Sequence, residues 1–211
     1  MLKSAILKSY SGKNKNASLL GIKAPSYNSF SEEWEGANVL SEMINRRSTE
    51  TIIFPKDEKY GEKYPRFVKI LKQLYNYVYN NDNVFKWLSH YSGYTPTEVL
   101  EQLKYGQGVL IIAKDNTAKY GETPHSATDI KVNLKWVRGL EMTKLNETIQ
   151  GTSFLIVATI LHEFVHYGRS KNKLDRVYEY GWGFEREAFG EIVDKDNANS
   201  LYQKNGWSFK K

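Results

Sequence analysis

The stretch "ATILHEFVHYGRS", residues 158–170, decides how the rest of the chain is interpreted. It places His162, Glu163 and His166 at the end of the most apolar run of the sequence, "SFLIVATIL" (153–161). Because residues 154–161 are apolar on every side of a helix apart from Thr159, the pattern predicts a buried helix. Burying an ionised carboxylate beside two imidazoles is unfavourable unless something compensates the charge. A bound dication would supply that compensation.

The spacing of these polar residues indicates a metal site. Positions i and i+4 of a helix lie about 40° apart around the axis and about 6 Å apart along it, so His162 and His166 can bind one ion. Glu163 is turned by about 100° from His162, and we expect it to contact a water molecule on that ion as general base. The alternative that stays open is a core helix that carries the pattern by chance.

A catalytic zinc site usually has three protein ligands, and the third must come from elsewhere in the chain. The segment "GWGFEREAFGEIV" (181–193) predicts a glycine-rich turn that runs into a second helix. On that helix Glu185 lies close to the apolar face, whereas Glu187 is turned further toward solvent. We therefore predict Glu185 as the third ligand. The alternatives are Glu187, Asp175, Glu179 and an upstream His.

A peptide hydrolase also needs a hydrogen-bond donor for the oxyanion that develops in the transition state. We predict Tyr180 for this role, because it sits in the glycine-rich turn that faces the ligand on the second site helix. Other residue types that can donate are available nearby: Tyr167, Tyr178, His125 and Arg186.

Upstream of the motif, the periodicity changes from helical to extended. Helical spacing predicts helices over 31–48, 64–80, 83–91 and 95–106, the last with Thr95 as N-cap and Pro96 at the first position. Short apolar runs predict strands at 51–54 and 108–115, and strict alternation predicts an edge-like strand at 130–136, after a polar loop over 116–128. The predicted fold class is α+β, with a small antiparallel-edged sheet packed on the motif helix and further helices.

The charge distribution suggests how the 211 residues are organised. Residues 1–30 contain five Lys and no acid, and we predict a loosely ordered basic arm or linker there. Residues 31–211 are predicted to form a single domain, with a helical lobe over 31–106 and the sheet and metal-site helices over 107–211. The remainder of the chain has 25 basic and 24 acidic residues, so a basic face for nucleic acid is not expected.

Composition excludes several kinds of site. The chain has no Cys, so disulfides, thiolate ligands and a Cys nucleophile are excluded. No window approaches 18 apolar residues, which predicts no membrane span, and the first residues lack the pattern of a secretory signal. We expect a monomer.

The motif and its surroundings resemble a known family. "HEFVH" followed by Glu185 is similar to the gluzincin metallopeptidases, and "LHEFVHYGRSKNK" with "GFEREAFGE" resembles the compact zincin-like domain of bacterial polymorphic toxins, the type-3 metallopeptidase toxin family. The resemblance extends over about residues 90–195. It implies a zincin fold with one zinc held by His162, His166 and Glu185 and with Glu163 as general base. The N-terminal half shows no delivery module of the kind such toxins carry.

The resemblance also implies a function. It implies a zinc-dependent peptidase that cleaves protein or peptide substrates, a cognate immunity or inhibitor protein, and secretion or delivery as an effector. Zincins of this kind bind the substrate backbone along an edge strand, for which we predict 130–136. Two alternatives stay open: an inactive zincin-fold binding module, and a metal hydrolase that acts on a non-peptide bond.

Overall fold

The computed structural model describes residues 59–104, 108–115, 120–126 and 128–210. All of these residues belong to one compact unit of the chain. The basic arm predicted over 1–30, the helix over 31–48 and the strand over 51–54 lie outside the described residues.

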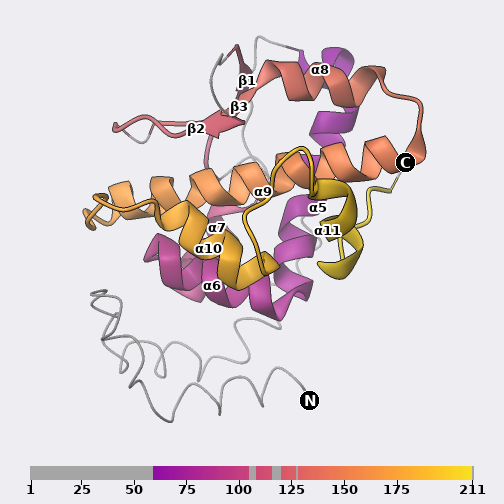
Figure 1. Cartoon of the computed structure of the whole chain (residues 1–211). Helices are drawn as coiled ribbons and strands as arrows, with labels where there is room; N and C mark the ends of the chain where they lie inside the picture. Colours follow the sequence, from indigo (N-terminus) through magenta and orange to yellow (C-terminus); the bar gives the residue numbers. More distant parts are fainter. Residues whose placement is uncertain (1–58, 105–107, 116–119, 127, 211) are drawn as a thin grey trace. The chain divides into compact units, whose positions relative to one another are not determined.

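The described residues form an α+β fold, as the sequence predicts. They combine helices with a small three-stranded sheet, which lies at one side of the helical part (Figure 1). In chain order the elements are α4 (Tyr60–Lys63), α5 (Pro65–Asn80), α6 (Asp82–Ser92), α7 (Pro96–Gln102), β1 (Ile111–Lys114), β2 (Gly121–Glu122), β3 (Ile130–Asn133), α8 (Leu134–Met142), α9 (Asn146–Lys171), α10 (Tyr180–Phe189) and α11 (Ala198–Lys204).

The sheet is mixed and has the strand order β1-β3-β2. β3 pairs in parallel with β1 and antiparallel with β2, so β3 is the central strand. The strand predicted over 130–136 is present but shorter, and the prediction that it lies at the edge of the sheet is wrong. It stops at Asn133, whose side chain accepts a hydrogen bond from the Lys135 amide and caps α8. The edge strand that contacts α9 is β2, within the segment predicted as a loop.

Helix α9 is the centre of the domain (Figure 1). It packs against α5, α6, α8, α10 and α11 and against strands β2 and β3. Among the described residues, it is the one helix long and apolar enough to cross a membrane by length and composition, but 83% of its apolar window is buried inside the domain. That burial is typical of the core helix of a folded domain, and it agrees with the prediction of a buried motif helix.

The chain reverses direction sharply after α9. Lys173 has a left-handed φ of 53°. The Lys173 amide donates to the Ser170 carbonyl, and the Leu174 amide donates to the Arg169 carbonyl. These two bonds are those of a Schellman motif, which satisfies carbonyls at a helix end. The reversal sends the following segment back toward α10, which packs on α9.

The remaining helices follow the local signals in the sequence. Pro65 begins α5, and α7 has a complete capping box between Thr95 and Glu98. Helix α7 ends at Gln102, before the predicted end at 106, and α10 covers 180–189 instead of continuing to 193.

Candidate metal centre

The two motif histidines meet on one side of α9. Nε2 of His162 and Nε2 of His166 are 3.2 Å apart, and both rings are mostly buried. Because the two residues are four positions apart on one helix, helical geometry places their side chains on the same side. The structure thus brings together the two imidazoles that the sequence predicts as ligands.

Glu179 supplies the third atom of this cluster. It is the residue that precedes α10, and its side chain makes no capping hydrogen bond to that helix. Instead, its carboxylate oxygens lie 3.5 Å from Nε2 of His162 and 3.5 Å from Nε2 of His166. Among the described residues, this trio forms a group of metal-ligating type whose ligand atoms lie within 4.8 Å of one another.

The spacing of the trio fits a tetrahedral metal ion. Ligand atoms about 2.0–2.2 Å from a tetrahedral zinc lie roughly 3.3–3.6 Å from each other. Here the two Nε2 atoms are 3.2 Å apart, and each lies 3.5 Å from one oxygen of the Glu179 carboxylate, Oε2 for His162 and Oε1 for His166. Two imidazole nitrogens and a carboxylate oxygen are also a ligand set that zinc uses in catalytic sites. The residues present therefore fit the metal that the motif implies.

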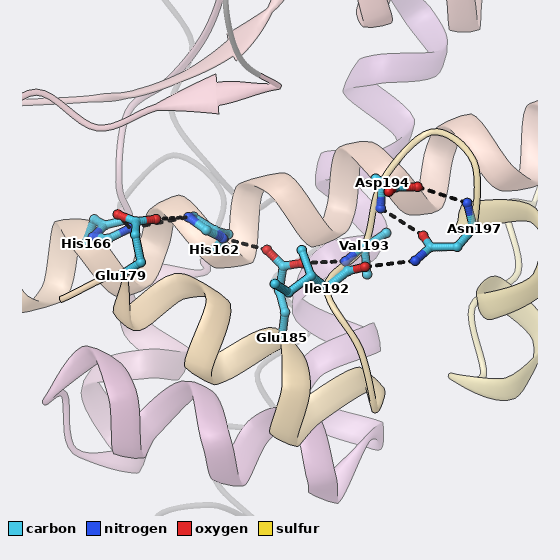
Figure 2. Close-up of polar contacts among 8 residues, drawn as sticks. All are labelled: His162, His166, Glu179, Glu185, Ile192, Val193, Asp194 and Asn197. Atoms are coloured by element: carbon cyan, nitrogen blue, oxygen red, sulfur yellow. Dashed lines mark hydrogen bonds and ion pairs between the residues drawn. The ribbon is translucent and has the colours of Figure 1, made fainter. Parts of the chain in front are cut away.

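Glu185, the predicted third ligand, lies on the other side of the His162 ring (Figure 2). Its Oε1 is 2.5 Å from Nδ1 of His162, and its Oε2 accepts a hydrogen bond of 2.6 Å from the Val193 amide. The two nitrogens of an imidazole point away from each other, so this carboxylate does not join the three converging atoms. It occupies the position of a carboxylate that orients a metal-binding His through the opposite ring nitrogen.

The segment after α10 holds Glu185 in place (Figure 2). The Val193 amide that bonds Glu185 belongs to a turn fixed by Asp194 and Asn197. The Asn197 Oδ1 accepts from the Asp194 amide, the Asp194 Oδ1 accepts from the Asn197 amide, and the Asn197 Nδ2 donates to the Ile192 carbonyl. This turn lies just beyond α10 and therefore extends the site into the C-terminal part of the chain.

A glycine allows α10 to approach the site. A Cβ at position 181 would lie 2.4 Å from Nε2 of His162 and 2.5 Å from two of its ring carbons. Only Gly fits between the α10 backbone and this ring. The sequence signal was the Gly-Trp-Gly run, which predicts a turn but gives no indication of the imidazole against it.

Glu163, the predicted general base, is buried on α9 beneath β2. A Cβ on Gly121 would lie 3.3 Å from Cγ of Glu163 and 2.6 Å from Cγ2 of Thr159, so β2 lies directly against this part of the helix. The Thr123 hydroxyl donates to the Glu163 carbonyl. The Glu163 side chain thus lies against the edge strand of the sheet.

Tyr180, the predicted oxyanion donor, has other partners in the structure. Its hydroxyl donates to Oδ2 of Asp175 at 2.5 Å, and the guanidinium carbon of Arg169 lies 3.4 Å from the centre of its ring. Among the alternatives, Tyr167 is buried, whereas Tyr178, His125 and Arg186 are exposed. The hydroxyl of Tyr180 has one proton, which its bond to Asp175 already uses.

The charges around the histidines separate their pKa values. Burial disfavours a charged His162, but its hydrogen bonds with Glu179 and Glu185 outweigh this and raise its pKa to about 10. Burial and the neighbouring His162 charge lower the pKa of His166 to about 4. Without a metal, near neutral pH, His162 is therefore protonated and positively charged, and two carboxylates stabilise this charge, whereas His166 is neutral. A dication would replace this proton with a larger charge at the same place.

Comparison with known proteins gives one family match. Residues 60–190 match the family model described as metallopeptidase toxin 3, and the match includes the motif helix, Glu179 and Glu185. No curated protein and no solved structure shows significant similarity to the chain. The matched segment covers more than half of the sequence, and the chain belongs to the metallopeptidase toxin 3 family.

Proposed function

We propose that this domain is a zinc-dependent peptidase that cleaves peptide bonds in protein substrates. One zinc per chain is held by His162, His166 and Glu179. The observation that carries the proposal is the convergence of three side chains: the two Nε2 atoms are 3.2 Å apart, and each lies 3.5 Å from one oxygen of the Glu179 carboxylate. In this assignment Glu179 replaces Glu185 as the third ligand, and Glu185 orients His162 through Nδ1.

Glu163 is the general base. A bound zinc lowers the pKa of a water molecule and polarises the substrate carbonyl. Glu163 accepts the proton of the attacking water and returns it to the nitrogen of the leaving amine, so that the carboxylate is regenerated. Its burial beneath β2 favours this role, because exclusion of solvent strengthens the electrostatic interactions of a carboxylate with the reacting groups.

The substrate lies along β2. The sheet has two outer strands, and the backbone of β1 is already engaged at Ala113, whose amide and carbonyl both bond the Tyr60 hydroxyl. β2 is the other outer strand, and it lies directly over Glu163. An extended peptide that adds to β2 would bring its backbone past the general base.

The family membership supports a biological setting for this activity. We propose that the domain acts as a delivered toxin on proteins of a target cell, and that an immunity protein inhibits it in the producing cell. An inactive binding module would need the metal ligands but not Glu163, and the presence of Glu163 favours the enzyme.

The proposal is tested with the purified full chain and its Glu163→Gln variant. Elemental analysis after dialysis should give about one zinc per chain for both. A peptide library followed by mass spectrometry should show cleavage by the wild type and a loss of about 10²–10⁴-fold in the variant. Glu187→Gln is the matched control, because Glu187 is exposed on α10, and it should retain activity.

Other outcomes would reject parts of the proposal. Zinc in both proteins without cleavage of any peptide would favour the binding module or a non-peptide substrate. Equal cleavage by the wild type and Glu163→Gln would exclude Glu163 as general base. A folded wild type without zinc would exclude the metal site.

A further inference from the structure

The third proposed ligand stands on a different kind of element from the other two. His162 and His166 project from a buried helix, whereas Glu179 is the last residue of a segment without helix or strand, residues 172–179, and its side chain is 50% exposed. Ordering a loop and a long side chain costs conformational entropy. This cost opposes metal binding unless other contacts already hold the loop and the side chain in place. The contacts that order this segment therefore bear directly on metal affinity.

Arg169 makes the first of these contacts. It lies on α9 three residues after His166 and is only 4% exposed, although it carries a guanidinium. Its Nε donates to the Asp175 carbonyl at 2.6 Å, and one terminal nitrogen donates to the Tyr91 carbonyl at 3.2 Å. A buried charge of this kind is retained only where its hydrogen bonds compensate its desolvation. The side chain thus ties the loop backbone to the helix that carries the histidines.

Asp175 and Tyr180 close the arrangement. The Asp175 carboxylate accepts from the Val177 amide at 2.8 Å through Oδ1 and from the Tyr180 hydroxyl at 2.5 Å through Oδ2. The Tyr180 ring lies under the Arg169 guanidinium at 3.4 Å. The three residues thus contact one another in pairs, Arg169 and Asp175 through the Asp175 backbone carbonyl, and Tyr180 directly follows Glu179 in the chain.

We propose that Arg169, Asp175 and Tyr180 form a clamp that holds Glu179 in position to bind the metal. The inference rests on the proposed function, because it takes Glu179 as a ligand. It assigns Tyr180 as a positioning residue in place of the oxyanion donor that the sequence predicts. The clamp also explains a buried arginine that no step of the hydrolysis uses.

A thermodynamic cycle on zinc affinity tests the clamp. Affinity is measured by competition with a chromogenic chelator for the wild type, Tyr180→Phe and Arg169→Lys, each also in a Glu179→Gln background. Residues that position metal ligands typically change metal affinity by about 10–100-fold. We expect that loss in the wild-type background and a change of less than about twofold when Glu179 is already replaced, because the clamp acts through Glu179.

The controls separate positioning from general damage. Tyr180→Phe keeps the ring that packs on Arg169, so this variant stays folded even if Arg169→Lys does not, and thermal melting of the metal-free proteins verifies this. Tyr178→Phe, the same change at an exposed neighbour, should leave zinc affinity unchanged.

Each other outcome overturns a defined statement. Equal losses in both backgrounds, or unchanged zinc affinity with a lower kcat in Tyr180→Phe, would reject the clamp. Unchanged affinity in Glu179→Gln alone would instead reject Glu179 as a ligand, which is the proposed function itself.

Discussion

The two sides of the metal centre are built in different ways. On one side, a single helix, α9, contributes His162, Glu163 and His166 within five consecutive residues. On the other side, Glu179 and Glu185 approach from a reversed loop and from α10, and each depends on contacts that are distant in sequence. A helix thus places its ligands on one side by its own geometry, whereas the position of a ligand on a loop depends on the contacts that hold the loop. The following predictions test this contrast.

The largest effect is expected on the helix side. His166→Ala removes a ligand that nothing else in the cluster can replace, and we expect loss of zinc and of peptidase activity together. The loss of affinity should exceed the 100-fold at the upper end for residues behind the ligands. Elemental analysis and chelator competition measure it. Retention of one zinc per chain would show that the cluster on α9 is not the site.

A matched pair of carboxylate variants compares the proposed ligand, Glu179, with the residue that orients His162, Glu185. We expect Glu179→Gln to weaken zinc binding more than Glu185→Gln, for which a loss of about 10–100-fold is typical. The reason is that Glu179 faces both Nε2 atoms, whereas Glu185 contacts Nδ1 of His162. Zinc affinities of the two variants decide the order. The reverse order would restore Glu185 as the ligand.

The close packing of α10 on the helix side gives a stability prediction. Gly181→Ala places a Cβ against the His162 ring, and overpacking of this kind costs about 1–3 kcal/mol in the free energy of unfolding. Gly139→Ala is the matched control in α8, where no atom lies within 4 Å, and it should raise stability by up to about 1 kcal/mol. Urea denaturation of the metal-free proteins measures both. Equal effects would mean that the contact with His162 has no energetic weight.

The pH dependence of zinc binding gives a further prediction. His162, with its pKa raised to about 10, carries a proton that zinc must displace, whereas His166, with its pKa lowered to about 4, does not. Between pH 6 and 8, zinc affinity should therefore fall by about tenfold for each unit of decreasing pH, with release of one proton on binding. Titration calorimetry in buffers of different ionisation enthalpy counts this proton.

The metal-free protein should show the opposite trend in stability. A raised folded-state pKa stabilises the fold fully below the ordinary His value of 6.5, and this contribution is lost as the pH rises toward 10. Denaturation of the metal-free chain across this range checks the sign. A stability that rises with pH over the same window would contradict the protonated His162.

The parts of the fold that the sequence predicts are those set by local patterns. The motif helix, the capping box of α7 and Pro65 at the start of α5 all follow from residues within a few positions of each other. The alternation over 130–136 misled because Asn133 caps a helix, in which Leu134, Val137 and Leu140 are buried at helical spacing. The residues that alternate like a strand include the first residues of helix α8, so the alternation alone does not show where the strand ends.

The site divides along the same line. The i, i+4 pair of histidines needs only one helix, and the structure brings the two rings together. The choice between Glu179 and Glu185 depends on which nitrogen of His162 faces α10, and that depends on the Schellman reversal, on Gly181 and on the Val193 amide. A helical wheel places Glu185 on the buried face, which is where it lies, but burial does not identify which atoms converge.

Helix α9 also affects how the chain behaves when it is unfolded. Its apolar window has the length and mean hydropathy of a membrane segment, and only the surrounding helices and strands cover it. Any event that unfolds the domain, such as translocation through a pore, exposes this window as one continuous apolar segment. Refolding must then be faster than self-association, since exposed apolar segments drive aggregation of unfolded chains. Among the described residues, the helix that carries the two histidines is therefore also a segment prone to aggregation when the domain is unfolded.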